Sequence, residues 1–116
     1  MHEMAITESV VEIVLNHAEL AGAKKVVHVR LKIGEIRDVI HDMMEKCFRY
    51  IARGTIAEEA ELEIMKVPLV VRCAGCGQED REDISNYAEM KCNHCGSTDL
   101  ELVSGNEFFI EDIKIV

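Results

Sequence analysis

The first 22 residues have the hydrophobic spacing of an amphipathic helix. Apolar positions recur every three or four residues, and Gly22 follows the last of them. Glycine just past such a stripe is typical of a helix end, so we expect the helix to stop near Gly22. This stripe comprises Ile6, Val10, Ile13, Val14, His17 and Ala21.

The spacing then changes to strict alternation, which is typical of a strand with one buried face. Valine, leucine and isoleucine occupy positions 27, 29, 31 and 33, and His28, Arg30 and Lys32 lie between them. Gly34 ends this predicted strand. The histidine, arginine and lysine are expected on its polar face.

Three further elements follow from the same kind of pattern. A second helical stripe comprises Ile40, Met43, Met44, Cys47, Phe48 and Ile51, and a second strand covers about 60–67, up to Pro68. After the turn-forming residues 104–106, apolar residues from Phe108 to Val116 predict a last strand. Residues 73–95 lack apolar periodicity, and no repeat is visible.

This order predicts an α+β fold. The two strands that a helix connects are expected to lie parallel to each other. The third strand completes a three-stranded mixed sheet with two helices on one face. The cysteine-containing segment is then an insertion between the second strand and the last. We expect one domain of residues 1–70 and 104–116, and a second of residues 71–103.

Charge and composition exclude several functions. Thirteen basic and 22 acidic residues in 116 give a net charge of −9, which disfavours nucleic acid as a partner. No apolar run approaches the roughly 20 residues that span a bilayer, and the first residues lack a secretory signal. We therefore expect a cytoplasmic protein, in which cysteines bind metal rather than form disulfides. No catalytic motif is present, so we expect no enzyme activity.

Four of the five cysteines form two Cys-x-x-Cys pairs, Cys73 with Cys76 and Cys92 with Cys95. This spacing is typical of a tetrahedral four-thiolate zinc site in a zinc ribbon, and four thiolates leave no open position for catalysis. A dithiol redox pair would need one such motif, not two. Iron in the same cage is equally compatible with the spacing.

The remaining cysteine and histidines carry weaker signals. Cys47 lies within an apolar stripe and is expected to be a buried small hydrophobe. His17, His28 and His94 are expected at the surface or its boundary. His41 has acidic neighbours, which suggest at most a secondary metal site.

The chain starts with Met1-His2-Glu3. The Met1 amine, the His2 amide nitrogen and the His2 imidazole can chelate one ion, and planar nitrogen donors suit Ni(II) or Cu(II). Glu3 can add its amide nitrogen or its carboxylate. Taken alone, these three residues are equally compatible with an ordinary frayed chain end that binds no metal.

Taken together, these motifs resemble the HypA family, the nickel metallochaperones of [NiFe]-hydrogenase maturation. The resemblance rests on Met1-His2-Glu3, on Leu31-Lys32-Ile33-Gly34-Glu35 and on the two Cys-x-x-Cys pairs, and it spans the whole chain. It implies Ni²⁺ as transient cargo at His2, with Met1 and Glu3 adjoining, and structural Zn²⁺ at the four paired cysteines.

The resemblance also implies partners, namely a HypB-type GTPase and the hydrogenase large subunit, with urease served in some relatives. The chain is expected as a monomer or as a homodimer, including one formed by exchange of the last strand. The alternative interpretation is a zinc-ribbon interaction module without a nickel role.

Overall fold

The computed structural model describes residues 3–116, and of residues 86–88 the backbone alone. The chain forms two compact units. The first comprises Met1–Lys32, Val39–Met65 and Phe109–Val116, and the second comprises Ile33–Asp38 and Lys66–Phe108. The predicted domain boundaries at 70 and 104 stay a prediction.

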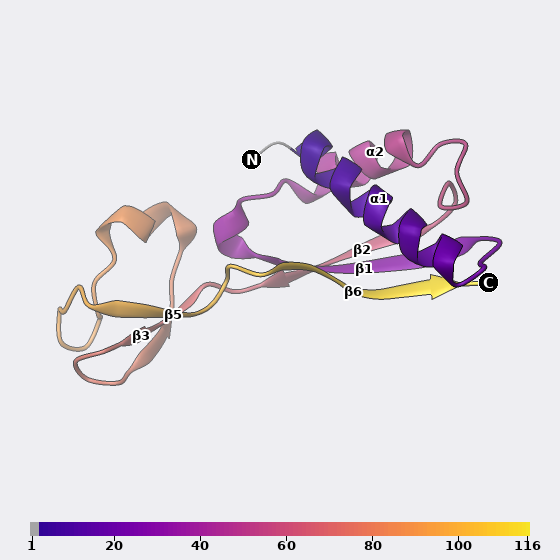
Figure 1. The fold of residues 1–116 in the computed structure, drawn as a ribbon. Coiled ribbons are helices and arrows are strands. Elements are labelled where there is room, and N and C mark those ends of the chain that lie inside the picture. Colours follow the sequence, from indigo (N-terminus) through magenta and orange to yellow (C-terminus); the bar gives the residue numbers. More distant parts are fainter. Residues whose placement is uncertain (1–2) are drawn as a thin grey trace. The chain divides into compact units, whose positions relative to one another are not determined.

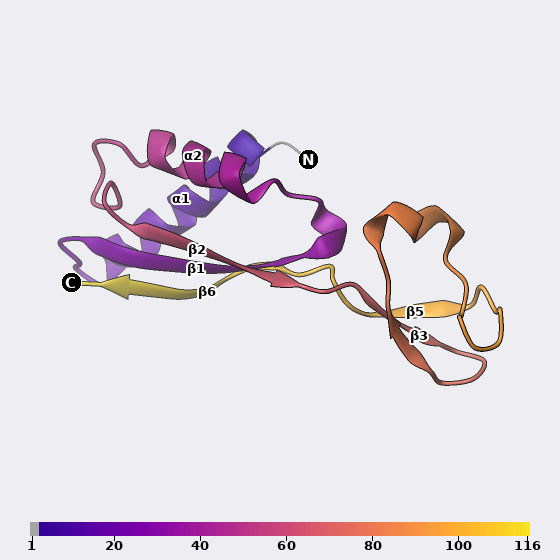
Figure 2. The same ribbon diagram turned by 180° about the vertical axis from the view of Figure 1, so that it is seen from behind.

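The first unit is built on a three-stranded sheet in the order β2-β1-β6. Its strands are β1 (Val26–Gly34), β2 (Glu61–Val67) and β6 (Phe108–Ile115). β1 and β2 run in the same direction and β6 runs against them, so the sheet is mixed (Figures 1 and 2). The helices α1 (Glu3–Leu20) and α2 (His41–Ile51) both cover one face of it. The predicted α+β fold is confirmed.

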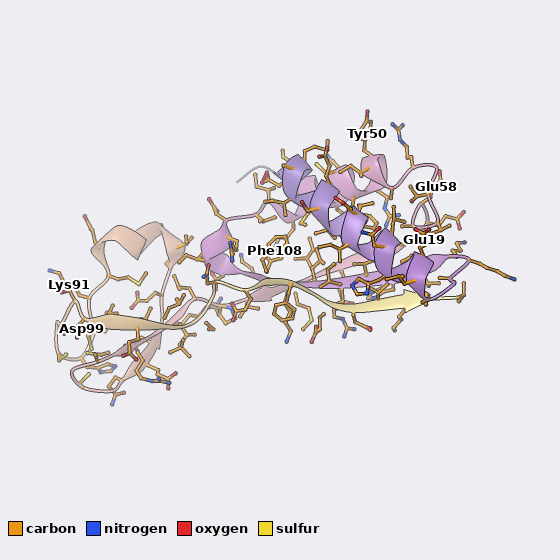
Figure 3. The ribbon with its side chains drawn as sticks, viewed as in Figure 1. Glu19, Tyr50, Glu58, Lys91, Asp99 and Phe108 are labelled. Carbon is orange, nitrogen blue, oxygen red and sulfur yellow. The ribbon has the colours of Figure 1, made fainter. Side chains whose placement is uncertain are left out.

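The core of this unit is mainly aliphatic and lies between the helices and the sheet. The side chains of Val14, Leu31 and Met44 are completely buried, as is Phe48. Tyr50, on the same helix as Phe48, points away from the sheet and is exposed (Figure 3). Burial of aliphatic side chains from both helices against β1 is the main stabilising contribution to the unit.

The inward face of α1 differs from the predicted one. Its buried residues are Glu3, Thr7, Val10, Val11, Val14 and Ala18. Ile13 is 46% exposed, whereas the exposure of His17 agrees with its expected position at the surface or its boundary. Thr7 tolerates burial because its hydroxyl donates a hydrogen bond to the Glu3 carbonyl, 2.5 Å away. The helix does end as predicted, with Gly22 at φ +68°.

The alternation in β1 holds from Val29 to Ile33 and fails before it. Val27 is exposed, whereas Val26 and His28 are buried. The prediction of a surface or boundary His28 is therefore wrong. Its Nε2 lies 3.2 Å from Oε1 of Glu63 on the adjacent strand β2, and this partner makes the burial tolerable.

The second unit contains short strands that apolar periodicity did not indicate. These are β3 (Val70–Cys73), β4 (Glu79–Arg81) and β5 (Leu100–Ser104), in the order β4-β3-β5, with both neighbours antiparallel to β3. Two 3-10 segments, η1 (Glu35–Arg37) and η2 (Ile84–Glu89), complete the unit. No helix among the described residues is long and apolar enough to cross a membrane.

Two glycines allow the backbone of η1 to approach the segment after β5. A Cβ on Gly34 would lie 2.0 Å from the Gly105 carbonyl oxygen, and Gly105 has φ +112°. The Ile36 N–H donates to that same carbonyl at 2.9 Å. Only glycine fits at both positions, which gives a physical reason for the Ile33-Gly34-Glu35 and Ser104-Gly105 sequences.

Candidate metal centre

The two Cys-x-x-Cys segments fold into equivalent turns. In the first, the Gly77 N–H donates to the Cys73 carbonyl at 2.8 Å, and in the second the Gly96 N–H donates to the Cys92 carbonyl at 2.9 Å. Each of these glycines follows the second cysteine of its pair and has a positive φ, +78° and +76°. The left-handed backbone that ends each turn is the reason for glycine there.

A second backbone hydrogen bond closes each turn, and its acceptor lies two residues after the second cysteine. The Cys73 N–H donates to the Gln78 carbonyl, and the Cys92 N–H donates to the Ser97 carbonyl. In addition, Ala74 donates to the Asp99 carbonyl at 2.9 Å, which continues the β3–β5 pairing past the first cysteine. Backbone hydrogen bonds therefore position all four cysteines.

The four sulfur atoms converge on one point. The Sγ atoms of all four cysteines lie within 4.8 Å of one another. Sγ of Cys73 is 3.5 Å from that of Cys95, and Sγ of Cys76 is 3.5 Å from that of Cys92. A metal bound at about 2.3 Å by a sulfur tetrahedron separates its ligands by about 3.8 Å. The set thus has the size of a tetrahedral thiolate cage.

Within each pair, the first cysteine is buried and the second is exposed, and their pKa values shift in opposite directions. The Cys76 N–H lowers the pKa of the Cys73 thiol to about 6. The N–H groups of Cys95 and His94 likewise lower the pKa of Cys92. Two thiolates are therefore stabilised by the backbone in the metal-free chain.

The second cysteine of each pair has a raised pKa. The Gln78 N–H lowers the pKa of Cys76, but hydrogen bonding with the Cys92 sulfur, together with burial, raises it to about 12. The pKa of Cys95 is also raised: the Ser97 N–H lowers it, but hydrogen bonding with Cys73 and Cys92, together with burial, more than offsets that effect.

The second unit contains a partly buried carboxylate that the sequence did not single out as functional. One oxygen of Glu35 accepts a hydrogen bond from the Leu69 N–H at 3.1 Å and lies 3.2 Å from Nη2 of Arg81. The sequence signal that could have pointed to Glu35 was its position at the end of the Leu31–Glu35 motif. Through the Leu69 N–H, Glu35 stabilises the backbone just before β3.

The remaining candidates are placed as follows. Met1 and His2 lie outside the described residues, and Glu3 begins α1, where it is buried. Cys47 is buried, as predicted, and His94 is exposed, with Nε2 3.3 Å from Asp80. Within residues 3–116, the four paired cysteines are the only group of three or more potential metal ligands that lie close together. His41 and its acidic neighbours form no such group.

Comparison with known proteins agrees with this arrangement over the full length. A family model described as "Hydrogenase/urease nickel incorporation, metallochaperone, hypA" matches residues 1–115. A hydrogenase maturation factor HypA from Dehalococcoides mccartyi (strain CBDB1) is 36% identical over 115 residues, covering 99% of this chain and 94% of the relative. The corresponding protein of Pyrococcus horikoshii is 35% identical over 133 aligned positions, with coverage of 99% and 96%.

Two solved structures share the fold. The solution structure of the Ni metallochaperone HypA from Helicobacter pylori has a TM-score of 0.67 at 21% identity, covering 100% of this chain and 98% of that one. A second solution structure, of a HypA protein, has a TM-score of 0.72 at 21% identity. With the family match over nearly every residue, the chain belongs to the HypA family of nickel metallochaperones and hydrogenase maturation factors.

Proposed function

We propose that this chain binds Ni(II) at its first residues and delivers it to the large subunit of [NiFe]-hydrogenase, while a structural zinc ion holds the cysteine ribbon. The observation that carries the proposal is the family match over residues 1–115, which includes the Met1-His2-Glu3 start. The first unit would carry the nickel and the second the zinc.

The ribbon cysteines are the ligands we assign to zinc. Their Sγ atoms have tetrahedral spacing, and four thiolates without carboxylate or water are the donor set of structural zinc sites. The surrounding strands have three to five residues each, too few to bury a core of their own. Zinc bound there would supply folding free energy, and it would leave no open position for catalysis.

The nickel ligands we assign are the Met1 amine, the His2 amide nitrogen and the His2 imidazole, with Glu3 as the adjoining donor. The Glu3 carboxylate already accepts a hydrogen bond from Ile40 through Oε1. The amide of Glu3, by contrast, belongs to the first turn of α1, where N–H groups have no partner within the helix. In this proposal Glu3 therefore contributes its amide nitrogen rather than its carboxylate.

Such a site suits transfer. Nickel held by consecutive donors of a chain end keeps coordination positions that ligands of a recipient can attack, whereas a closed thiolate cage exchanges its ion slowly. Binding should weaken in acid, because protons compete for the imidazole, the amine and the amide nitrogen. A HypB-type GTPase and the hydrogenase large subunit are the partners we assign, in the cytoplasm, where thiols stay reduced.

The nickel site is tested by calorimetric titration of the untagged protein and of His2→Ala. We expect the substitution to abolish specific Ni²⁺ binding and to leave one zinc per chain. His17→Ala, which removes an exposed histidine from α1, is the matched control and should bind nickel normally. Equal nickel affinity in His2→Ala would contradict the proposal and would leave a zinc-ribbon interaction module.

Delivery is tested separately. Nickel-loaded protein is mixed with the nickel-free precursor of the large subunit and a chelator, and the precursor's nickel is measured after separation. We expect transfer from the wild type and none from His2→Ala. Equal loading of the precursor by free Ni²⁺ at the same concentration would contradict a delivery role while leaving nickel binding intact.

A further inference from the structure

The second unit contains an open groove with apolar side chains in its lining. Its volume is about 910 Å³, within the range of clefts that bind ligands. Val71 of β3 and the β5 residues Leu100 and Leu102 line it, and Met90, which follows η2, contributes a fourth apolar side chain. The whole groove lies within one unit of the chain.

The pairing of β3 with β5 brings the valine and the two leucines together. Val71 lies opposite Leu102, and Leu100 lies two residues before Leu102 on β5, so the three side chains share one face of the sheet. Arg72 and Glu101 are opposite each other and alternate with these residues, which places them on the other face. Val71 is buried, whereas Leu102 is 46% exposed, so β5 presents apolar surface to the groove.

The candidate metal centre does not need this apolar surface. The backbone hydrogen bonds that close the two cysteine turns involve neither Leu102 nor Met90. Apolar surface that stays in water contributes no folding free energy, because that contribution comes from removing it from water. Apolar side chains gathered in an open groove are instead typical of a site that a partner covers.

Charge indicates which kind of partner fits the groove. The second unit carries five basic and ten acidic side chains, a net charge of −5, against −4 for the larger first unit. Two of its arginines are paired within the unit, Arg72 with Glu79 and Arg81 with Glu35. Four thiolates around one Zn²⁺ would add a further −2. The unit therefore attracts a positively charged segment and repels an acidic one or a nucleic acid.

The polar side chains of the groove favour polypeptide as the occupant. They are Glu89, Lys91 and Thr98. Glu89 is exposed and can pair with a basic side chain that flanks the apolar ones. Lys91 and Thr98 are donors, and the main-chain carbonyl groups of a bound segment would accept from them. A purely hydrocarbon ligand offers no such acceptors.

We propose that this groove binds an extended segment of a partner protein, in which two apolar side chains two residues apart are flanked by basic residues. Alternate side chains of an extended chain point the same way and lie about 6–7 Å apart, which is also the spacing of Leu100 and Leu102 along β5. The apolar pair covers these leucines and Met90, and a basic side chain meets Glu89. The second unit thus has a binding role besides holding a metal, and this role is independent of nickel at the first residues.

Synthetic peptides test the proposal on the full-length, zinc-loaded protein. The probe is the acetylated and amidated peptide Lys-Lys-Leu-Ser-Leu-Lys-Lys, and NMR follows the backbone amide signals of the protein. We expect saturable shifts centred on Val71, Thr98, Leu100 and Leu102, with a submillimolar dissociation constant because the groove is small. In one control peptide Glu replaces every Lys, and in the other Ser replaces both Leu. Both should bind about tenfold more weakly or less.

Matched substitutions locate the binding site. Leu102→Ser removes an apolar side chain from the groove and should weaken binding of the probe by about fivefold or more. Val103→Ser should leave binding unchanged, because Val103 is 41% exposed but does not line the groove. Glu89→Lys should weaken binding by about threefold or more, whereas Glu101→Lys makes the same charge change on the other face of β5 and should have a smaller effect. The zinc content of each variant verifies that the ribbon is folded.

The proposal is wrong if the probe causes no saturable shift at millimolar concentration, or if the Glu peptide binds as tightly as the Lys peptide. It is also wrong if Leu102→Ser and Val103→Ser bind the probe equally. Shifts of the same signals by the detergent octyl glucoside, with none by the peptides, would overturn it and assign the groove to a lipid-like ligand. No nickel is present in these measurements, so this inference and the proposed nickel role fail separately.

Discussion

The Glu3 carboxylate accepts a hydrogen bond from the Ile40 N–H, with Oε1 3.3 Å from the nitrogen. Ile40 is the N-cap residue of α2 and has no side-chain oxygen with which to cap the helix itself. The first residue of α1 thus satisfies a backbone donor at the start of α2. The residue next to His2 is held in place by the pair of helices that covers the sheet.

Removing this carboxylate should cost stability. We expect Glu3→Ala to lower the free energy of unfolding by about 1 kcal/mol, since the cap is lost and the Ile40 N–H is left without an acceptor. Glu3→Gln keeps an oxygen and should lose less. Urea denaturation followed by circular dichroism measures both, with Glu8→Ala on the exposed side of α1 as the control. Equal stability of all three variants would show that the contact contributes nothing.

Loss of one ribbon thiolate should affect one unit of the chain. Cys76→Ser is expected to release zinc and to abolish the thiolate absorption of the cobalt-substituted protein, because a structural site needs all four ligands. NMR signals of residues 70–104 should broaden or collapse, while those of α1 and α2 persist. Cys47→Ala, which removes the buried cysteine of α2, should retain one zinc per chain. Full zinc content in Cys76→Ser would exclude Cys76 as a ligand.

The pKa values of the cysteines predict how many protons zinc displaces. With a pKa of about 6, Cys73 is mostly thiolate at pH 7, whereas Cys76, at about 12, carries its proton. Cys95 is shifted upward and Cys92 downward. Zinc binding at pH 7 should therefore release about two to three protons rather than four.

The number should rise as the pH falls through about 6, because Cys73 then becomes protonated in the free protein. Calorimetry in buffers of different ionisation enthalpy measures the proton count. Release of four protons at pH 7 would contradict the stabilised thiolate at Cys73.

The close approach at Gly34 should not tolerate a side chain. A Cβ there would lie 2.0 Å from the Gly105 carbonyl oxygen, which is backbone and has no freedom to move aside. We expect Gly34→Ala to destabilise the protein by about 2 kcal/mol or more, as overpacking does. Gly75→Ala is the control, because its Cβ would be 3.7 Å from the Cys73 Sγ, an ordinary contact. Thermal unfolding of the zinc-loaded protein distinguishes the two.

Glu63 is expected to be the most sensitive charged residue of the sheet. Its Oε1 lies 3.2 Å from Nε2 of the buried His28, and its Oε2 lies 3.0 Å from Nε of Arg30. Glu63→Ala leaves both nitrogens without a carboxylate and should cost about 1–2 kcal/mol. Glu61→Ala, at an exposed position of the same strand, should cost almost nothing. Similar unfolding midpoints for the two variants would contradict this role of Glu63.

Local patterns predicted much of the ribbon and the order of the main elements. The two Cys-x-x-Cys-Gly segments specify their own turns, since each needs one glycine with positive φ and bonds over four or five residues. The strands β3, β4 and β5 around these segments were missed because they are too short for a hydrophobic period to be recognised. β3 pairs with β4 and β5 because the chain folds back to bring the two pairs of cysteines together.

The inward face of α1 was beyond sequence reasoning. Ile13 and Val14 are equally apolar, yet Val14 is completely buried and Ile13 is not. Which of them faces the sheet depends on how the helix rotates to pack against β1 and α2, and Glu3 and Thr7 then lie on the buried side. A stripe of apolar residues carries no information about bonds that polar residues make within the core.

The sequence by itself determined the α+β element order, the four-cysteine set and the family of the chain, because these depend on periodicity and spacing along the backbone. Tertiary structure decided the convergence of the four sulfurs, the pairing of Glu3 with Ile40 and the burial of His28 beside Glu63. Each of these joins residues that are distant in the chain, and their meeting depends on how helices and strands pack.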